Sequence, residues 1–179
     1  MKNLKLLVLL VFILGFNSVN AQLQKGNLLI GGQAGFNVQF NEGDDSFSLS
    51  MNPNILALVS DNFALGGSLG FTYSSFIGFS NTAVGFLPQG RLYLPQNDKM
   101  AIFLDAQIGL QFLNINFNGD SESETVFTYA FGPGIAYFIS DDVSIDTGLS
   151  YNYSGGDFDR SSLNLTVGIQ VFLTRKDKE

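Results

Sequence analysis

The sequence predicts an all-β protein, namely an eight-stranded antiparallel up-and-down transmembrane β-barrel that is preceded by a cleaved signal peptide. Three observations predict this class: a composition rich in glycine and phenylalanine but poor in charge, an N-terminal secretory leader, and eight segments in which apolar and polar residues alternate. Because successive side chains of a strand point to opposite faces, the alternation indicates strands with two chemically different faces.

The composition excludes several classes of protein. Charged residues make up 14% of the chain, against about 25% in an ordinary soluble domain, so much of the surface faces something other than water. No apolar run of the length of a membrane-spanning helix follows the N-terminus, which excludes helical spans. The chain contains no Cys and no His, which excludes disulfides, thiolate metal sites and histidine-based catalysis. We therefore predict no cofactor and no metal site.

The N-terminus has the parts of a secretory signal. Two lysines precede the apolar stretch Leu6–Phe16, and residues 19–21 (Val-Asn-Ala) place small side chains at the −3 and −1 positions of a cleavage site. Residues 1–21 are therefore predicted to be a signal peptide. The apolar stretch spans about 16 Å as a helix, which is too short for an uncleaved anchor in a core of about 30 Å. Loss of the two lysines takes the formal net charge from −7 to −9, so no nucleic-acid partner is expected.

Side chains alternate with period 2 in eight segments. One face carries large aliphatic and aromatic residues, and the other carries Gly and small neutral polar residues, with Arg91, Asp105 and Asp146 as its only charges. A soluble barrel or sandwich also alternates, but its water-facing side would carry Lys, Glu and Arg. The pattern instead indicates a narrow, filled lumen and a lipid-facing wall that must close, because every strand edge in a bilayer has to be paired. The segments are 28–39, 47–55, 63–73, 84–94, 102–112, 127–137, 143–153 and 163–173.

The connections alternate in length, as an up-and-down barrel requires. Tight turns are predicted at 60–62, 95–99 and 140–142, and longer connections at 41–46, 77–81, 118–124 and 154–161. Short periplasmic turns and longer outer loops are typical of outer-membrane barrels. We therefore expect residues 22–174 to form a barrel in a bacterial outer membrane, residues 175–179 to form a periplasmic tail, and both termini to lie in the periplasm.

Proline recurs at one place in the predicted hairpins. Pro53, Pro88 and Pro133 each lie seven residues before a turn, in an even-numbered strand. A proline inside a paired strand cannot donate a ladder hydrogen bond and marks a bulge or an edge. Unless the spacing is a coincidence, it predicts a shared bend in the three hairpins.

The hairpins around two of these prolines resemble those of a known family. Residues 52–66 and 132–141 are similar to hairpins of the small outer-membrane β-barrel family of the OmpX/OmpW type, the outer membrane protein beta-barrel domain. The resemblance covers nearly all of residues 24–173. It implies the barrel fold, outer-membrane lipids as surroundings and the barrel-assembly machinery as a partner during biogenesis, but no activity. That machinery usually reads a C-terminal aromatic residue, whereas here the apolar face ends at Leu173 and Phe172 has the opposite parity.

Three functional classes compete for such a barrel. An enzyme is disfavoured, because Ser-based hydrolysis or acyl transfer needs a His base that the chain lacks. We expect a structural or surface-interaction role, with a lumen closed by side chains. A narrow channel for ions or small solutes is the alternative, because the inward face of residues 130–136 is unusually small. That face leaves a thin water path unless Phe103 or Leu87 fills it.

The predicted outer loops are acidic. Their charged residues are Glu42, Asp44, Asp45, Asp120, Glu122, Glu124, Asp157 and Asp159 against a single Arg160. Polar loops are the default at a surface. Such a rim also suits divalent-cation bridging to anionic headgroups or a basic protein partner. Whether a protein partner exists, extracellular or periplasmic, stays open.

The three lumen charges are predicted to form a cluster near the periplasmic end. Counting across the turn at 95–99 places Gln89 opposite Asp105 and Arg91 opposite Phe103, with Arg91 diagonal to Asp105. Asp146 lies at about the height of Arg91 and faces small residues. An unpaired buried charge costs about 3–5 kcal/mol, so we expect Arg91 to contact Asp105, Asp146 or both and to plug the pore. Solvation of each charge by lumen water is the alternative.

Signal cleavage gives the first testable prediction. N-terminal sequencing of the protein from the membrane fraction is expected to begin at Gln22, because the small residues before it fit the signal peptidase site. Retention of Lys2 and Lys5 in the membrane-bound protein would contradict the secretory interpretation.

Overall fold

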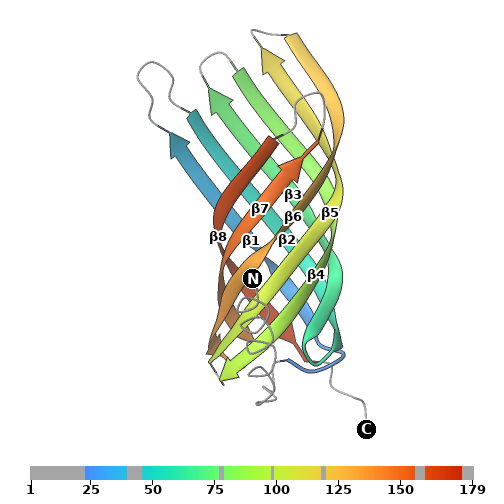
Figure 1. The fold of residues 1–179 in the computed structure, drawn as a ribbon, viewed down its shortest axis with the longest axis vertical. Helices are drawn as coiled ribbons and strands as arrows, with labels where there is room; N and C mark the ends of the chain where they lie inside the picture. Colours follow the sequence, from blue (N-terminus) through green and yellow to red (C-terminus); the bar gives the residue numbers. More distant parts are fainter. Residues whose placement is uncertain are drawn as a thin grey trace, which may run out of the picture.

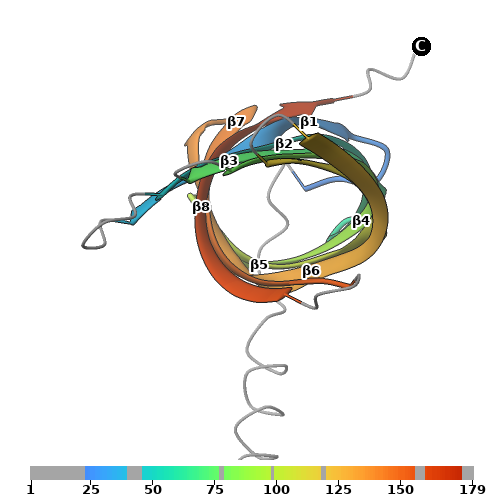
Figure 2. The same ribbon diagram turned by 90° about the horizontal axis from the view of Figure 1, so that it is seen from above.

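The computed structural model describes residues 23–39, 46–76, 79–97, 99–117, 120–155 and 160–174. Eight strands form one antiparallel sheet that closes into a barrel in the order β1 to β8 (Figures 1 and 2). They are β1 (Leu28–Gln39), β2 (Ser46–Ser60), β3 (Phe63–Phe76), β4 (Phe79–Asn97), β5 (Met100–Phe117), β6 (Asp120–Ser140), β7 (Val143–Ser154) and β8 (Arg160–Leu173). The predicted fold class is confirmed. The predicted signal peptide and tail, residues 1–21 and 175–179, lie outside the described residues.

No helix in the described part of the chain has the length and apolarity needed to cross a bilayer.

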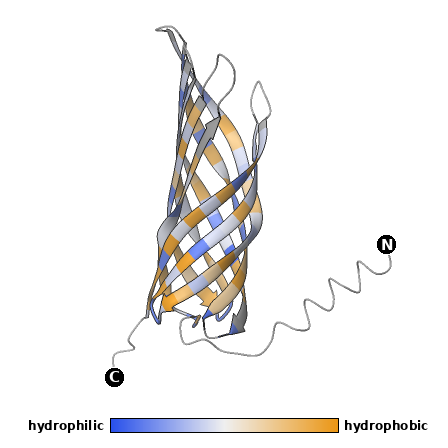
Figure 3. Cartoon of the chain, turned by 90° about the vertical axis from the view of Figure 1, so that its left-hand side faces the viewer, coloured by the Kyte–Doolittle hydropathy of each residue, from blue (hydrophilic) through white to orange (hydrophobic). Residues whose placement is uncertain are grey.

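The two faces of the wall differ as the alternation predicts. In β7 the inward side chains of Ser144 and Asp146 are 0% and 1% exposed, whereas the outward Ile145 and Leu149 are 39% and 49% exposed. Figure 3 shows apolar and polar bands alternating along the strands. Large apolar residues are exposed on the outside of every strand. Apolar surface of this extent needs a nonpolar surrounding, which a bilayer supplies.

Each short turn between strands contains two residues and follows an irregularity in the ladder. The turns are residues 61–62, 98–99 and 141–142. The register shifts just before them, between Leu58 and Ser60, between Pro95 and Asn97, and between Phe138 and Ser140. β4 therefore continues past Pro95, and the middle turn is shorter and later than the predicted 95–99. We call this end of the barrel the turn end and the opposite end the loop end.

The strands around β5 extend further toward the loop end than the sequence predicts (Figure 1). Residues 77–78 join β3 to β4 and residues 118–119 join β5 to β6, in place of the predicted connections 77–81 and 118–124. Residues 120–124 of β6 are paired with β5. They are Asp, Ser, Glu, Ser and Glu, polar on both faces, so a search for alternation assigns them to a loop.

The three prolines interrupt the ladder on one side. Pro53, Pro88 and Pro133 each pair with the preceding strand. Toward the following strand, each proline and the residue before it drop out of the ladder, which then resumes in the same register. A proline has no N–H to donate, so a gap is the expected consequence. The register shifts lie at the turns and not at the prolines, and the shared bend stays a prediction.

The segment before β1 folds under the turn end. Leu23 is 1% exposed. The backbone N–H of Lys25 donates to Oδ1 of Asp61 over 3.0 Å, and the N–H of Gly26 donates to the carbonyl oxygen of Leu58 over 2.8 Å. Gly26 has a φ of 96°, a conformation that glycine adopts at little cost. This turn carries Leu23 into the mouth of the barrel.

Charge on the lipid-facing wall gives the second prediction. Replacing Ile108 or Val167, which are 52% and 53% exposed on the outside, with Arg is expected to cost about 2–4 kcal/mol of unfolding free energy near mid-membrane. The matched control is Thr72→Arg, which places the same charge in the polar lumen and should cost less. Denaturant titration in phospholipid vesicles measures both, and equal losses on the two faces would show that inside and outside are misassigned.

Candidate functional site

Large apolar side chains fill the lumen at the turn end. Tyr93 is 0% exposed, and Phe103 and Phe172 are each 1% exposed. The ring centroids of Phe138 and Phe172 lie 5.4 Å apart, and those of Tyr93 and Phe103 lie 6.1 Å apart. We call this layer the apolar plug. Its members are Leu23, Leu29, Leu56, Leu58, Ala64, Tyr93, Ala101, Phe103, Ala136, Phe138 and Phe172.

The sequence does not predict the apolar plug as a layer, because it places Gly, small residues and three charges on the inner face and offers only Phe103 or Leu87 to fill the space. A signal for it is present in the sequence. Just before the first turn, residues 55–59 are Ile-Leu-Ala-Leu-Val, so the strand is apolar on both faces there. An apolar run at the end of an otherwise alternating strand indicates that the inner face is apolar as well.

The structure brings the three predicted lumen charges together above the apolar plug. Nε of Arg91 (β4) donates to Oδ2 of Asp105 (β5) over 2.7 Å, and Nη1 of Arg91 donates to Oδ2 of Asp146 (β7) over 2.6 Å. The side chain of Arg91 is fully buried, and those of Asp105 and Asp146 are 14% and 2% exposed. Because β4 and β7 are not neighbours, the bond to Asp146 crosses the lumen and ties opposite walls together.

The register around Arg91 differs from the predicted one by two residues. Arg91 lies directly opposite Asp105, Gln89 lies opposite Gln107, and Tyr93 lies opposite Phe103. The cause is the later position of the turn, between Asn97 and Met100, which shifts β5 by two residues along β4. A slip of two residues keeps every side chain on its predicted face, since the strand period is two.

Four polar neighbours complete this group, which we call the charge cluster. Gln89 donates from Nε2 to Oδ2 of Asp105 over 2.7 Å, and Gln107 donates from Nε2 to Oδ1 over 3.3 Å. Ser144 donates from Oγ to Oδ1 of Asp146 over 2.7 Å. The hydroxyl of Tyr93 accepts from Nη1 of Arg91 over 3.3 Å. Sequence reasoning placed Gln89 beside Asp105 but missed the other three, each of which lies two residues from its partner on the same strand.

The Arg91 guanidinium also lies over an aromatic ring. Its Cζ is 4.2 Å from the ring centroid of Phe103, a cation–π geometry. Nη2 is buried without a hydrogen-bond partner among the described residues. The ring thus lies against the cation where hydrogen bonding is incomplete.

The small residues of β6 accommodate Phe103. A Cβ atom added at Gly134 would overlap the Phe103 ring, so only glycine fits there. Asp146 is flanked at its height by Ala136 and Gly168, which leaves room for the carboxylate. The small inner face of β6 therefore makes room for the Phe103 ring and the Asp146 carboxylate. Of the two alternatives that the sequence leaves open, this is the one in which a bulky side chain fills the space.

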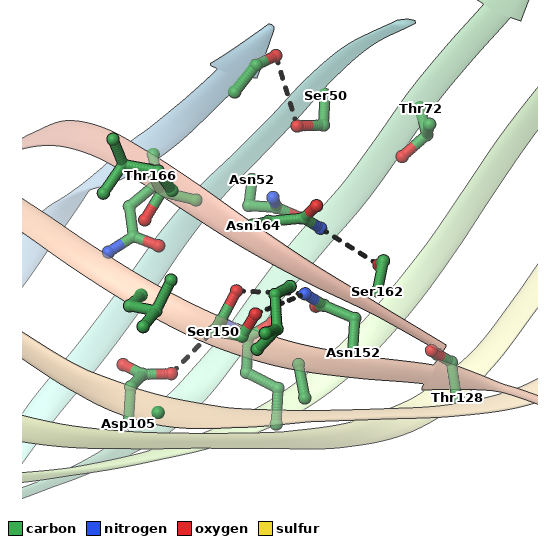
Figure 4. A pocket seen from close by; sticks show the side chains of 18 of the residues that line it. Ser50, Asn52, Thr72, Asp105, Thr128, Ser150, Asn152, Ser162, Asn164 and Thr166 are labelled. Atoms are coloured by element: carbon green, nitrogen blue, oxygen red, sulfur yellow. Dashed lines mark hydrogen bonds between the residues drawn. The ribbon is translucent and has the colours of Figure 1, made fainter. Parts of the chain in front are cut away.

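On the loop side of the charge cluster the lumen widens into a polar cavity of about 660 Å³, which we call the vestibule. Figure 4 shows hydroxyl and amide side chains reaching it from several strands, among them Ser50, Asn52, Thr128, Asn152 and Asn164. Asp105 forms part of its floor. The lumen thus has three layers from the turn end upward, namely the apolar plug, the charge cluster and the vestibule.

Several residues of the predicted acidic rim cannot be placed. Glu42, Asp44, Asp45, Asp157 and Asp159 lie outside the described residues, and only the backbone of Asp120 and Arg160 is described. Of the rim, Glu122 is exposed and Glu124 is half-buried.

A closed eight-stranded barrel with a lipid-facing wall and a filled lumen defines a small transmembrane barrel of the outer-membrane class. The chain belongs to the outer membrane protein beta-barrel domain family, whose sequence model matches residues 6–170. The resemblance seen in the hairpins is thereby confirmed, and membership supports the bacterial outer membrane as the location. A comparison with curated proteins gave no match.

Solved structures of small outer-membrane barrels share the fold. Neisserial surface protein A (NspA) is 16% identical over 82% of this chain and 97% of that chain, with a TM-score of 0.58. The N-terminal barrel domain of Pseudomonas aeruginosa OprF is 12% identical over 83% and 98%, with a TM-score of 0.56. Ail, the attachment invasion locus protein of Yersinia pestis, is 17% identical over 84% and 100%, with a TM-score of 0.52. At these identities the similarity shows the fold alone.

The third prediction concerns the bond across the lumen. Asp146→Ala is expected to lower the free energy of unfolding by about 3–5 kcal/mol, because it removes one of the two carboxylates from a fully buried guanidinium. Asp141→Ala, at an exposed turn position, is the matched control and should change stability little. A loss at Asp146 no larger than at Asp141 would mean that water already solvates Arg91.

Proposed function

We propose that this chain is an integral outer-membrane protein with a structural or surface-interaction role and a lumen closed to transport. The observation that carries the proposal is the bond from Arg91 to Asp146, which joins opposite walls directly above the apolar plug. An ion that crosses the barrel would have to break this bond and pass the packed rings of Tyr93, Phe103 and Phe172.

The short turns support an orientation with both termini in the periplasm. The three two-residue turns, the buried Leu23 and the end of β8 at Leu173 all lie at the turn end. Outer-membrane barrels keep their short turns on the periplasmic side. The vestibule then opens outward, and the apolar plug seals the periplasmic mouth.

A role without catalysis fits the chemistry of the charge cluster. Both oxygens of Asp105 and both oxygens of Asp146 already accept hydrogen bonds or ion pairs. A general base needs a free lone pair near a nucleophile, and the chain has no His to supply one. The cluster therefore serves to close the lumen.

The loop end supports a surface role. Among the described residues Thr128 is the last β6 residue that pairs with β7, and β6 continues beyond it as the edge of a ribbon of β4, β5 and β6. Exposed polar side chains such as Asn116, Ser121 and Glu122 lie on this ribbon. A polar ribbon above the membrane presents side chains and a strand edge to the outside, where a protein partner can bind.

Conductance of the purified, refolded protein in planar bilayers is the fourth prediction. The wild-type barrel is expected to show no stable unitary conductance, because both the charge cluster and the apolar plug obstruct the lumen. A variant with Arg91→Ser and Phe103→Ala, which thins both layers, is the comparison and should conduct. Stable openings of the wild-type protein would support the alternative, a narrow channel for ions or small solutes.

A further inference from the structure

The vestibule contains a niche beside Gly70, on the inner face of β3. Gly70 is buried, and a Cβ atom added to it would lie 3.5 Å from Oδ1 of Asn52 on β2 and 3.1 Å from Nε2 of Gln111 on β5. It would also lie 3.0 Å from Cδ1 of Leu87 on β4. Because glycine has no Cβ, a ligand group can approach the backbone between these three side chains. We call Gly70, Asn52, Gln111 and Leu87 the glycine niche.

The register explains why two amides converge over β3. Gly70 pairs with Gly85 of β4, and Gly85 pairs with Gln111 of β5. A Cβ atom at Gly85 would overlap Cγ of Gln111, so the stem of Gln111 crosses over Gly85 and brings its amide to Gly70. Asn52 reaches the same place from β2, which pairs with β3 on its other side.

Both amides of the niche keep their hydrogen-bonding capacity. Asn52 and Gln111 line the vestibule and are half-buried, and their side chains form no hydrogen bond with another described residue. Oδ1 of Asn52 accepts and Nε2 of Gln111 donates, so one hydroxyl group between them can donate to the first and accept from the second. Leu87, which is 5% exposed, offers an apolar surface beside them. The niche therefore suits a carbon atom that carries a hydroxyl group.

The rest of the vestibule favours a neutral ligand. Among the described residues that line it, Asp105 is the only charged one. Its oxygens accept from Arg91, Gln89 and Gln107, so it offers little to a cation, and its charge repels an anion. The hydroxyl and amide groups of the wall both donate and accept hydrogen bonds, as a polyhydroxy compound requires. The volume of about 660 Å³ falls within the usual range of small-molecule sites, about 300–1,000 Å³.

Solvent reaches the vestibule from the loop end. Along β8 the residues that line it change from Thr166, which is 8% exposed, to Asn164 and Ser162, which are exposed. Figure 4 shows these side chains around the same cavity as Asn52. A water-soluble ligand therefore has access to the vestibule without crossing the wall or the charge cluster.

We propose that the vestibule binds a neutral monosaccharide unit from the aqueous side. One hydroxyl group of the sugar lies between Asn52 and Gln111, and an apolar part of its ring lies against Leu87. Binding involves no passage through the barrel, because Gly85 precedes Arg91 along β4, which begins at the loop end. The inference is therefore independent of the closed lumen: conductance tests closure, and sugar binding tests the niche.

The binding test uses the full mature chain in phosphatidylcholine nanodiscs and methyl glucoside as the neutral probe. Saturable NMR shifts of the Asn52 and Gln111 side-chain amides are expected. Methyl glucuronide, in which a carboxylate replaces the CH₂OH group, should bind at least about tenfold more weakly. Equal affinity for the two probes would overturn the proposal. Shifts that do not saturate with methyl glucoside would mean that water alone occupies the niche, which overturns it as well.

Gly70→Ala tests the niche itself. The added Cβ would contact the ends of the Leu87 and Gln111 side chains, which can shift slightly, so the barrel is expected to fold. Glucoside binding should weaken by at least about tenfold, because the methyl group occupies the approach between the two amides. Gly148→Ala on β7, whose nearest contact would be Oγ1 of Thr166 at 3.3 Å, is the matched control and should bind as the wild type does.

Two asparagine variants separate the niche from the general polarity of the vestibule. Asn52→Leu and Asn164→Leu each remove one amide from the cavity wall, but only Asn52 belongs to the niche. Asn52→Leu should weaken glucoside binding by about tenfold, and Asn164→Leu should leave it nearly unchanged. Backbone amide NMR spectra show whether each variant keeps the barrel. Equal losses in the two asparagine variants, or unchanged binding in Gly70→Ala, would overturn this site.

Discussion

Hydrocarbon offers no water to the backbone, so every N–H and C=O group of a strand in the membrane must pair with a neighbouring strand. This chain meets the constraint by closing eight strands into a barrel. Closure of so few strands leaves a bore that side chains nearly fill. What occupies that bore then follows from chemistry. Apolar side chains pack in the apolar plug, which seals the turn-end mouth of the barrel. Above it, the fully buried Arg91 pairs with two carboxylates in the charge cluster. Hydroxyl and amide groups line the vestibule, where the lumen widens.

The same constraint decides what the sequence predicts well. The face of each side chain follows from period-2 alternation, and the exposed and buried residues of β7 and β8 agree with it. Register does not follow, because a slip of two residues leaves every face unchanged. The placement of Arg91 opposite Asp105, where the sequence predicts Phe103, is such a slip. The three charges nevertheless meet, since a long arginine side chain reaches either the direct or the diagonal position.

Features that break the alternation are the ones that sequence reasoning misses. The apolar plug requires inward apolar residues such as Leu56 and Phe138, and these look like lipid-facing residues when the strand around them is apolar throughout. The upper part of β6 fails for the opposite reason, because residues 120–124 are polar on both faces. In both cases the two faces of the strand meet the same surroundings. Period-2 alternation detects only a chemical difference between the two faces of a strand, so it fails where both faces carry the same kind of residue.

Among the described residues the ladder between β1 and β8 is shorter than those between consecutive strands, and the cause lies in the chain's connectivity. Every other pair of neighbouring strands is consecutive in the chain, whereas β1 and β8 are its first and last strands and no connection joins them. Their ladder is complete at the turn end, where Leu23 and Phe172 pack in the apolar plug. At the loop end nothing comparable holds β1 to β8 among the described residues, and each strand follows its hairpin partner. The turn end of this strand pair is thus held by packing in the apolar plug, whereas its loop end depends on the two flanking hairpins.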